Sequence, residues 1–141
     1  MNEKLFYSSI IIGSLIVYIS ICFYHKELLP IYILTYIGII TSIMNHGGIS
    51  NTGISNSNNL IKIIDRGFMC ILSIVYLYYY LLMKDSFLKR QLLYIILLMI
   101  LLYFLSKVVK PADKEVSIYI HMIVHIFALF AFTIITLHIQ L

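Results

Sequence analysis

Charged side chains are scarce in this sequence, and their scarcity excludes most classes of soluble protein. Only 11% of the 141 residues are Asp, Glu, Lys or Arg, whereas 62% are hydrophobic, and the mean hydropathy is +0.99. Soluble domains carry about 25% charged and about 45–50% apolar residues. Most of the surface must therefore face lipid, and we expect an integral membrane protein.

Cysteine is also rare, and the basic residues are few and clustered. Cys22 and Cys70 both fall within apolar runs, which argues against a disulfide framework. The net charge of +4 arises from ten Lys and Arg residues that stand in short groups between the apolar runs. Such groups are typical of helix ends anchored at lipid headgroups, and they give no indication of nucleic-acid binding.

About five apolar segments are long enough to cross a bilayer, which requires about 20 residues for each crossing. The sequence thus predicts an all-α, polytopic transmembrane bundle of about five helices in a single domain, residues 1–141. A Gly-, Ser- and Asn-rich stretch is expected to form a polar loop over residues 47–59. The expected helices cover about 5–24, 29–46, 60–83, 91–109 and 116–140.

The distribution of basic residues predicts which helix ends share a side of the membrane. With five spans, the N-terminus, the loop 47–59 and the turn at 110–115 lie on one side. Six of the Lys and Arg residues fall on that side and four on the other, so the positive-inside rule places the N-terminus in the cytoplasm. His25 and His138 are expected near the opposite side.

Five polar residues stand within or beside the apolar segments, where such side chains are costly and are candidates for function. Ser42 and His46 lie one turn apart at the end of the second expected helix. Asp65 lies near the start of the third, and His121 and His125 share one face of the fifth. The expected topology brings all of them to one side of the membrane at a similar depth.

This set of residues predicts a metal site. Three neutral imidazoles with an open fourth position are typical of catalytic zinc, so we expect His46, His121 and His125 to bind Zn²⁺. Zinc lowers the pKa of a bound water to about 7 and polarises a carbonyl group. Asp65 can orient that water and accept its proton, and the Ser42 hydroxyl can hydrogen-bond the water or a developing oxyanion.

The order Ser-x3-His, then Asp, then His-x3-His, each in an expected helix, resembles the CREST superfamily of membrane proteins. That superfamily includes alkaline ceramidases, progestin and adipoQ receptors, and hemolysin III-type proteins. The resemblance covers about residues 42–125 and implies zinc ligands at the three histidines, with Asp65 and Ser42 serving the bound water. It also implies hydrolysis of a lipid amide. Members usually have seven helices, whereas this sequence has room for about five.

We therefore expect a zinc-dependent intramembrane hydrolase of a lipid amide or ester, with a ceramide-like lipid or an acyl ester as substrate. The main alternative is a receptor-like or structural membrane protein without enzymatic activity, which has kept or lost the metal. A haem-binding electron-transfer bundle is a third, since His46 and His125 could ligate haem from two helices. Each residue also has a structural explanation: Asp65 could pair with Lys62, and Ser42 could pack between helices.

Overall fold

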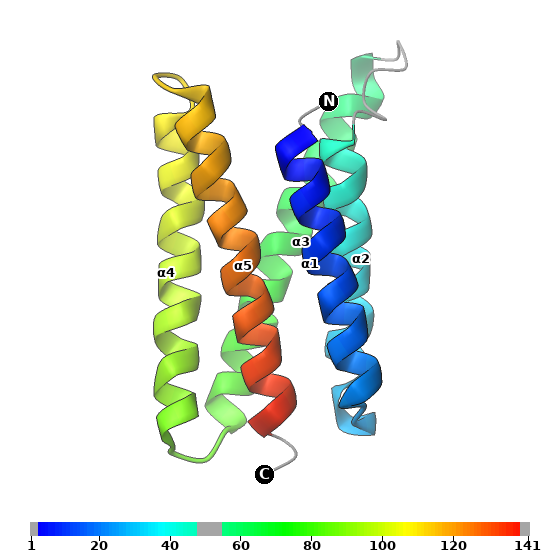
Figure 1. Cartoon of the computed structure of the whole chain (residues 1–141), viewed down its shortest axis with the longest axis vertical. Helices are drawn as coiled ribbons and strands as arrows, with labels where there is room; N and C mark the ends of the chain where they lie inside the picture. Colours follow the sequence, from blue (N-terminus) through cyan, green and yellow to red (C-terminus); the bar gives the residue numbers. More distant parts are fainter. Residues whose placement is uncertain (1–2, 48–54, 139–141) are drawn as a thin grey trace.

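The computed structural model describes residues 3–47 and 55–138, and it contains no strand within these ranges. A short 3-10 helix, Lys26–Leu28, precedes the second of five α-helices. The predicted all-α bundle is therefore confirmed (Figure 1). The helices are α1 (Glu3–Cys22), α2 (Leu29–His46), α3 (Ser55–Leu82), α4 (Phe87–Val109) and α5 (Lys114–His138).

The helices alternate in direction along the bundle (Figure 1). The starts of α1, α3 and α5 and the ends of α2 and α4 therefore share one end of the molecule, which we call the site end. In the order of the chain, α1 packs on α2, α2 on α3 and α4 on α5. The bundle closes where α1 packs against α5, and these two helices run parallel to each other (Figure 1).

Within the part of the chain that the structure describes, four helical segments are long and apolar enough to cross a membrane, with mean hydropathies between 1.7 and 2.5. Large hydrophobic side chains remain exposed along the outside of the bundle, for example Ile21 at 72% and Ile74 at 68%. Such a surface is stable in lipid and not in water. The chain is therefore an integral membrane protein that crosses the bilayer more than once. The four segments are Glu3–Cys22, Lys26–His46, Phe87–Val109 and Lys114–His138.

The third helix begins earlier than its apolar sequence predicts. It starts at Ser55, so residues 55–59 are helical and their assignment to a polar loop is wrong. Serine and asparagine are only moderately unfavourable inside helices, and an established apolar helix can extend through them. The remainder of the expected loop, residues 48–54, lies outside the described residues.

Side-chain caps explain why α4 and α5 also begin before the predicted positions. The Ser86 hydroxyl accepts a hydrogen bond from the Lys89 backbone N–H at 3.1 Å, and α4 starts at the next residue, Phe87. The Asp113 carboxylate accepts one from the Val116 N–H at 3.0 Å, directly before α5. Each cap satisfies a backbone donor that the first helical turn leaves free.

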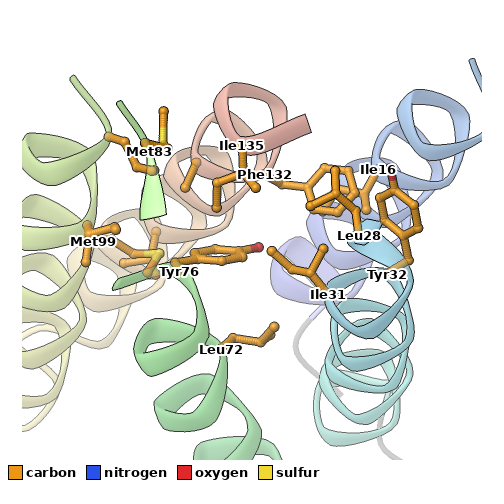
Figure 2. Packing of buried hydrophobic residues seen from close by; sticks show 14 residues of the cluster. Ile16, Leu28, Ile31, Tyr32, Leu72, Tyr76, Met83, Met99, Phe132 and Ile135 are labelled. Carbon is orange, nitrogen blue, oxygen red and sulfur yellow. The ribbon is translucent and has the colours of Figure 1, made fainter. Parts of the chain in front are cut away.

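Most of the fully buried side chains, Ser106 and Val124 apart, lie in the half of the bundle away from the site end. Figure 2 shows the core residues around Tyr76 and Phe132. Tyr76 of α3 is 1% exposed, and Phe132 of α5 is fully buried. The Phe132 ring lies 5.8 Å from the ring of Tyr32 on α2. The core takes residues from all five described helices and fixes their register, because shifting one helix would open cavities against the others.

Two glycines allow the first three helices to approach closely. A Cβ atom added to Gly13 of α1 would lie 2.6 Å from Cγ2 of Ile39 on α2. A Cβ atom added to Gly38 of α2 would lie 2.8 Å from Cδ1 of Leu72 on α3. Small residues commonly occupy such contacts between membrane helices, where dispersion forces replace the hydrophobic effect.

Candidate metal centre

The three histidines come together at the site end, as the sequence predicts. His46 is the last residue of α2, and His121 and His125 lie one turn apart on α5. One ring nitrogen from each lies within 4.8 Å of the other two. The ring centroids are 5.0–6.0 Å apart, and the two α5 histidines are buried while His46 is half-buried.

These nitrogens suit a metal ion. Zinc binds imidazole nitrogen at 2.0–2.1 Å, so two nitrogens in a tetrahedral site lie about 3.4 Å apart. Small side-chain rotations would bring the nitrogens from within 4.8 Å to that separation. In addition, Nε2 of His46 is buried and has no hydrogen-bond partner among the described residues. Burying such an atom unpaired is costly, and a metal ion would satisfy it.

A serine on α1 orients the third histidine. Ser8 Oγ lies 3.0 Å from Nδ1 of His125 and donates its only hydrogen to the Leu5 carbonyl at 2.9 Å. The hydroxyl oxygen therefore accepts a hydrogen bond from the Nδ1–H of His125, which leaves the lone pair on Nε2. Holding the second nitrogen in this way is characteristic of metal-ligating histidines.

Sequence reasoning missed Ser8, although the Ser8–Ser9 pair in an apolar helix was a signal. Serine in an apolar helix usually bonds its own backbone three or four residues back, and Ser8 does this as well. The additional bond to His125 depends on how α1 lies against α5, which the sequence alone does not give.

Ser42 lies beside the histidines, but its hydrogen bond is to α1. Its Oγ is 3.1 Å from Oγ of Ser9, whose hydrogen goes to the Leu5 carbonyl. Ser42 is therefore the donor in this pair. It also lines, with His125, an apolar cavity of about 60 Å³ between α1, α2, α3 and α5. The bond to Ser9 accounts for Ser42 as a helix-packing residue, and its role toward a substrate stays a prediction.

Asp65 is held by the residue that precedes the first histidine. Its carboxylate is buried, and Oδ2 accepts a hydrogen bond from Nδ2 of Asn45 at 2.7 Å. The alternative pairing with Lys62 is not formed, since the one ion pair among the described side chains joins Lys4 and Glu115. Asn45 thus places a carboxylate near the histidines without neutralising it.

Asp65, His46 and His121 line the same pocket, an open cavity of about 610 Å³ at the site end. We call it the site pocket. Two of the three predicted zinc ligands and the predicted general base therefore line one open pocket, which a reactant can enter. His125 lies deeper, on the apolar cavity behind the pocket. His25 and His138 lie at the other end of the bundle, as expected.

Helix α4 contributes two residues that sequence reasoning did not include in the site. The Tyr103 ring lies 5.8 Å from the His121 ring, and the Lys107 ammonium lies 4.7 Å above the Tyr103 ring. Lys107 also lines the site pocket. The spacing of four residues between a tyrosine and a lysine in an apolar helix places both on one face, which was an available signal.

Comparison with known proteins does not identify the chain. No family model, curated protein or solved structure matches it. The resemblance to the CREST superfamily therefore rests on the order and spacing of five residues. The geometry of these residues and their neighbours is what indicates the chemistry of the site.

We predict that Ser8→Ala lowers zinc affinity about 10–100-fold, because His125 loses the partner that fixes its tautomer and orientation. Competition with a chromophoric chelator in detergent measures the affinity. Ser14→Ala is the matched control, since Ser14 is an exposed serine on the same helix and should bind zinc like the wild type. Equal affinities for both variants would contradict the role assigned to Ser8.

Proposed function

We propose that the protein is a zinc-dependent intramembrane hydrolase that cleaves an amide or ester bond of a lipid. The observation that carries this proposal is the unpaired, buried Nε2 of His46 beside His121 and His125. A structural cluster would pair that atom, whereas an open metal site requires it free. The buried carboxylate of Asp65 in the same pocket adds the base that hydrolysis needs.

Each residue has a defined task in this reaction. A bound zinc ion would supply an acidified water and polarise the scissile carbonyl. Asn45 holds Oδ2 of Asp65 and leaves Oδ1 to accept a proton from that water. The water oxygen bonds to the carbonyl carbon, the C–N or C–O bond breaks, and the leaving amine or alcohol takes the proton. The products are a fatty acid and the remaining headgroup portion.

A lipid can approach the histidines from the side. An apolar groove of about 230 Å³ lies between α3 and α4, lined by Met69, Ile74 and Phe104 among others. Tyr103 lines the groove and contacts His121, so the groove leads from the lipid-facing surface toward the candidate metal centre. An acyl chain in this groove would place its carbonyl group near the site pocket.

We also propose that α3 is a fifth transmembrane span and that the N-terminus is cytoplasmic. With 28 residues, α3 is about 42 Å long, which exceeds the hydrocarbon core of a bilayer. It joins the end of α2 at the site end to the start of α4 at the other end (Figure 1). Lys62, Asp65 and Arg66 then lie near the site end and line the pocket.

We predict that cysteines introduced at Ser50 and Asp113 react with a membrane-impermeant label from the same side of the membrane. A cysteine at Asp85 should react from the opposite side, because α3 and α4 then each cross once. Cys22 and Cys70 are replaced by serine beforehand, and labelling of sealed vesicles is compared with permeabilised ones. Labelling of Ser50 and Asp85 positions from one side would mean that α3 does not cross.

We predict that Asp65→Asn keeps zinc but lowers turnover about 10²–10⁴-fold, the loss expected when a general base is removed. Release of fatty acid from a panel of ceramides and acyl esters in nanodiscs measures turnover. Asp85→Asn is the control, because Asp85 is exposed at the opposite end of the bundle. If Asp65 were only structural, Asp65→Asn would lower stability and leave turnover per folded molecule intact.

The arrangement of the three rings favours a metal ion over haem. Haem ligation would require the porphyrin plane to pass between His46 and His125. The His121 ring lies 5.5 Å from one and 5.0 Å from the other, which places it where the porphyrin would have to be.

A receptor-like protein without activity would bind zinc and release no fatty acid from any lipid of the panel.

A further inference from the structure

Positive charge is concentrated around the mouth of the site pocket. Six of the ten Lys and Arg residues in the chain line this pocket, together with three carboxylates. They come from α1, α3 and α5 and from the end of α4, so the fold and not the local sequence brings them together. The six are Lys4, Lys62, Arg66, Lys107, Lys110 and Lys114.

The six cations of the pocket outnumber its three carboxylates, so positive charge is left in excess. Lys4 pairs with Glu115 at 2.9 Å, and this is the one ion pair among the described side chains. The other five cations, which we call the mouth cations, therefore form no direct ion pair with a described carboxylate. Lys107 is close enough to Arg66 and Lys110 to be repelled by both, and it is attracted by the Asp65 carboxylate. One carboxylate does not balance three cations, and like charges held this close are stabilised by a further anion.

Anchoring of helix ends at lipid headgroups does not require this convergence. For anchoring, cations can stand anywhere around the bundle, and the opposite end shows that pattern. There, Lys89 donates a hydrogen bond to the Met83 carbonyl at 2.8 Å and lies over the Tyr80 ring. The pocket at that end is lined by Glu27, His138, tyrosines and apolar residues and by no Lys or Arg of the described residues.

We propose that the mouth cations bind the phosphate of an anionic phospholipid, so that the lipid recognised by this site is a phosphate-bearing acyl ester and not a neutral ceramide. Arg66 can bind phosphate oxygens through two parallel hydrogen bonds, and the lysines add point charges around it. With the phosphate at the mouth and an acyl chain in the groove between α3 and α4, the ester carbonyl lies between them, near the histidines. The inference rests on the proposed function for the bond that is cleaved, but phosphate binding does not need the metal.

The test compares two double variants that remove the same amount of charge. Arg66→Gln with Lys107→Gln removes two mouth cations, and Lys84→Gln with Arg90→Gln removes two exposed cations at the opposite end. Protein stripped of metal is mixed in detergent with phosphatidylglycerol and a diacylglycerol of the same chains. Native mass spectrometry then measures how much of each lipid remains bound.

The wild type and the opposite-end variant should retain phosphatidylglycerol in preference to the diacylglycerol. The mouth variant should lose about tenfold or more in phosphatidylglycerol binding, since each cation near an anionic headgroup contributes substantially. The charge-conserving variant, Arg66→Lys with Lys107→Arg, should retain the preference, which separates charge loss from misfolding. Equal phosphatidylglycerol binding by the mouth variant and the opposite-end variant would overturn the inference.

Three further outcomes distinguish the source of the phosphate and separate this inference from the proposed function. Displacement of phosphatidylglycerol by submillimolar inorganic phosphate would show that the ligand is a soluble phosphate compound and would overturn the assignment to a lipid. Selective phosphatidylglycerol binding without any fatty-acid release after zinc is restored would contradict the hydrolase and support the phosphate site. Ceramide hydrolysis with no phosphatidylglycerol preference would do the reverse.

Discussion

A polar atom inside a membrane-spanning bundle must find its partner within the protein, because lipid offers none. At the site end, three pairs of polar side chains meet this requirement by hydrogen-bonding to each other. Ser8 bonds His125, Ser9 bonds Ser42, and Asn45 bonds Asp65. The buried Nε2 of His46 has no such partner among the described residues, and the His46 ring lies beside two further imidazoles. The candidate metal centre follows from this unpaired nitrogen and from the two imidazoles beside it.

The rest of the fold serves to hold this arrangement in register. Lys4 donates hydrogen bonds to Glu115 and Tyr119, both at 2.9 Å, and so fixes the start of α1 beside the start of α5. One turn further along α1, Ser8 reaches His125. On the other side of α5, the Ser117 hydroxyl bonds the Ser106 carbonyl of α4 at 2.7 Å. That contact brings the face of α4 that carries Tyr103 and Lys107 to the pocket.

The sequence was sufficient to predict the helices and the meeting of the three histidines, because both follow from helical periodicity and alternating direction. The sequence was insufficient to predict the contact of Ser8 with His125. A serine that bonds its own backbone in an apolar helix has the same sequence pattern with or without a partner on another helix. For a similar reason, the sequence could not predict that Arg66 and Lys107 line the same pocket. Positive residues at helix ends predict a membrane side but not the direction in which each side chain points. The start of α3 could not be predicted, because the polar residues 55–59 have the composition of a loop and yet continue the apolar helix.

The central hypothesis is that three imidazoles bind a zinc ion at the site end. X-ray absorption at the zinc edge of detergent-purified protein tests it most directly. We expect about one zinc per chain, with three nitrogen ligands at 2.0–2.1 Å and one oxygen ligand, and loss of this signal in His121→Ala. Absence of bound zinc after zinc has been supplied, or sulfur ligands at about 2.3 Å from Cys22 or Cys70, would contradict the claim.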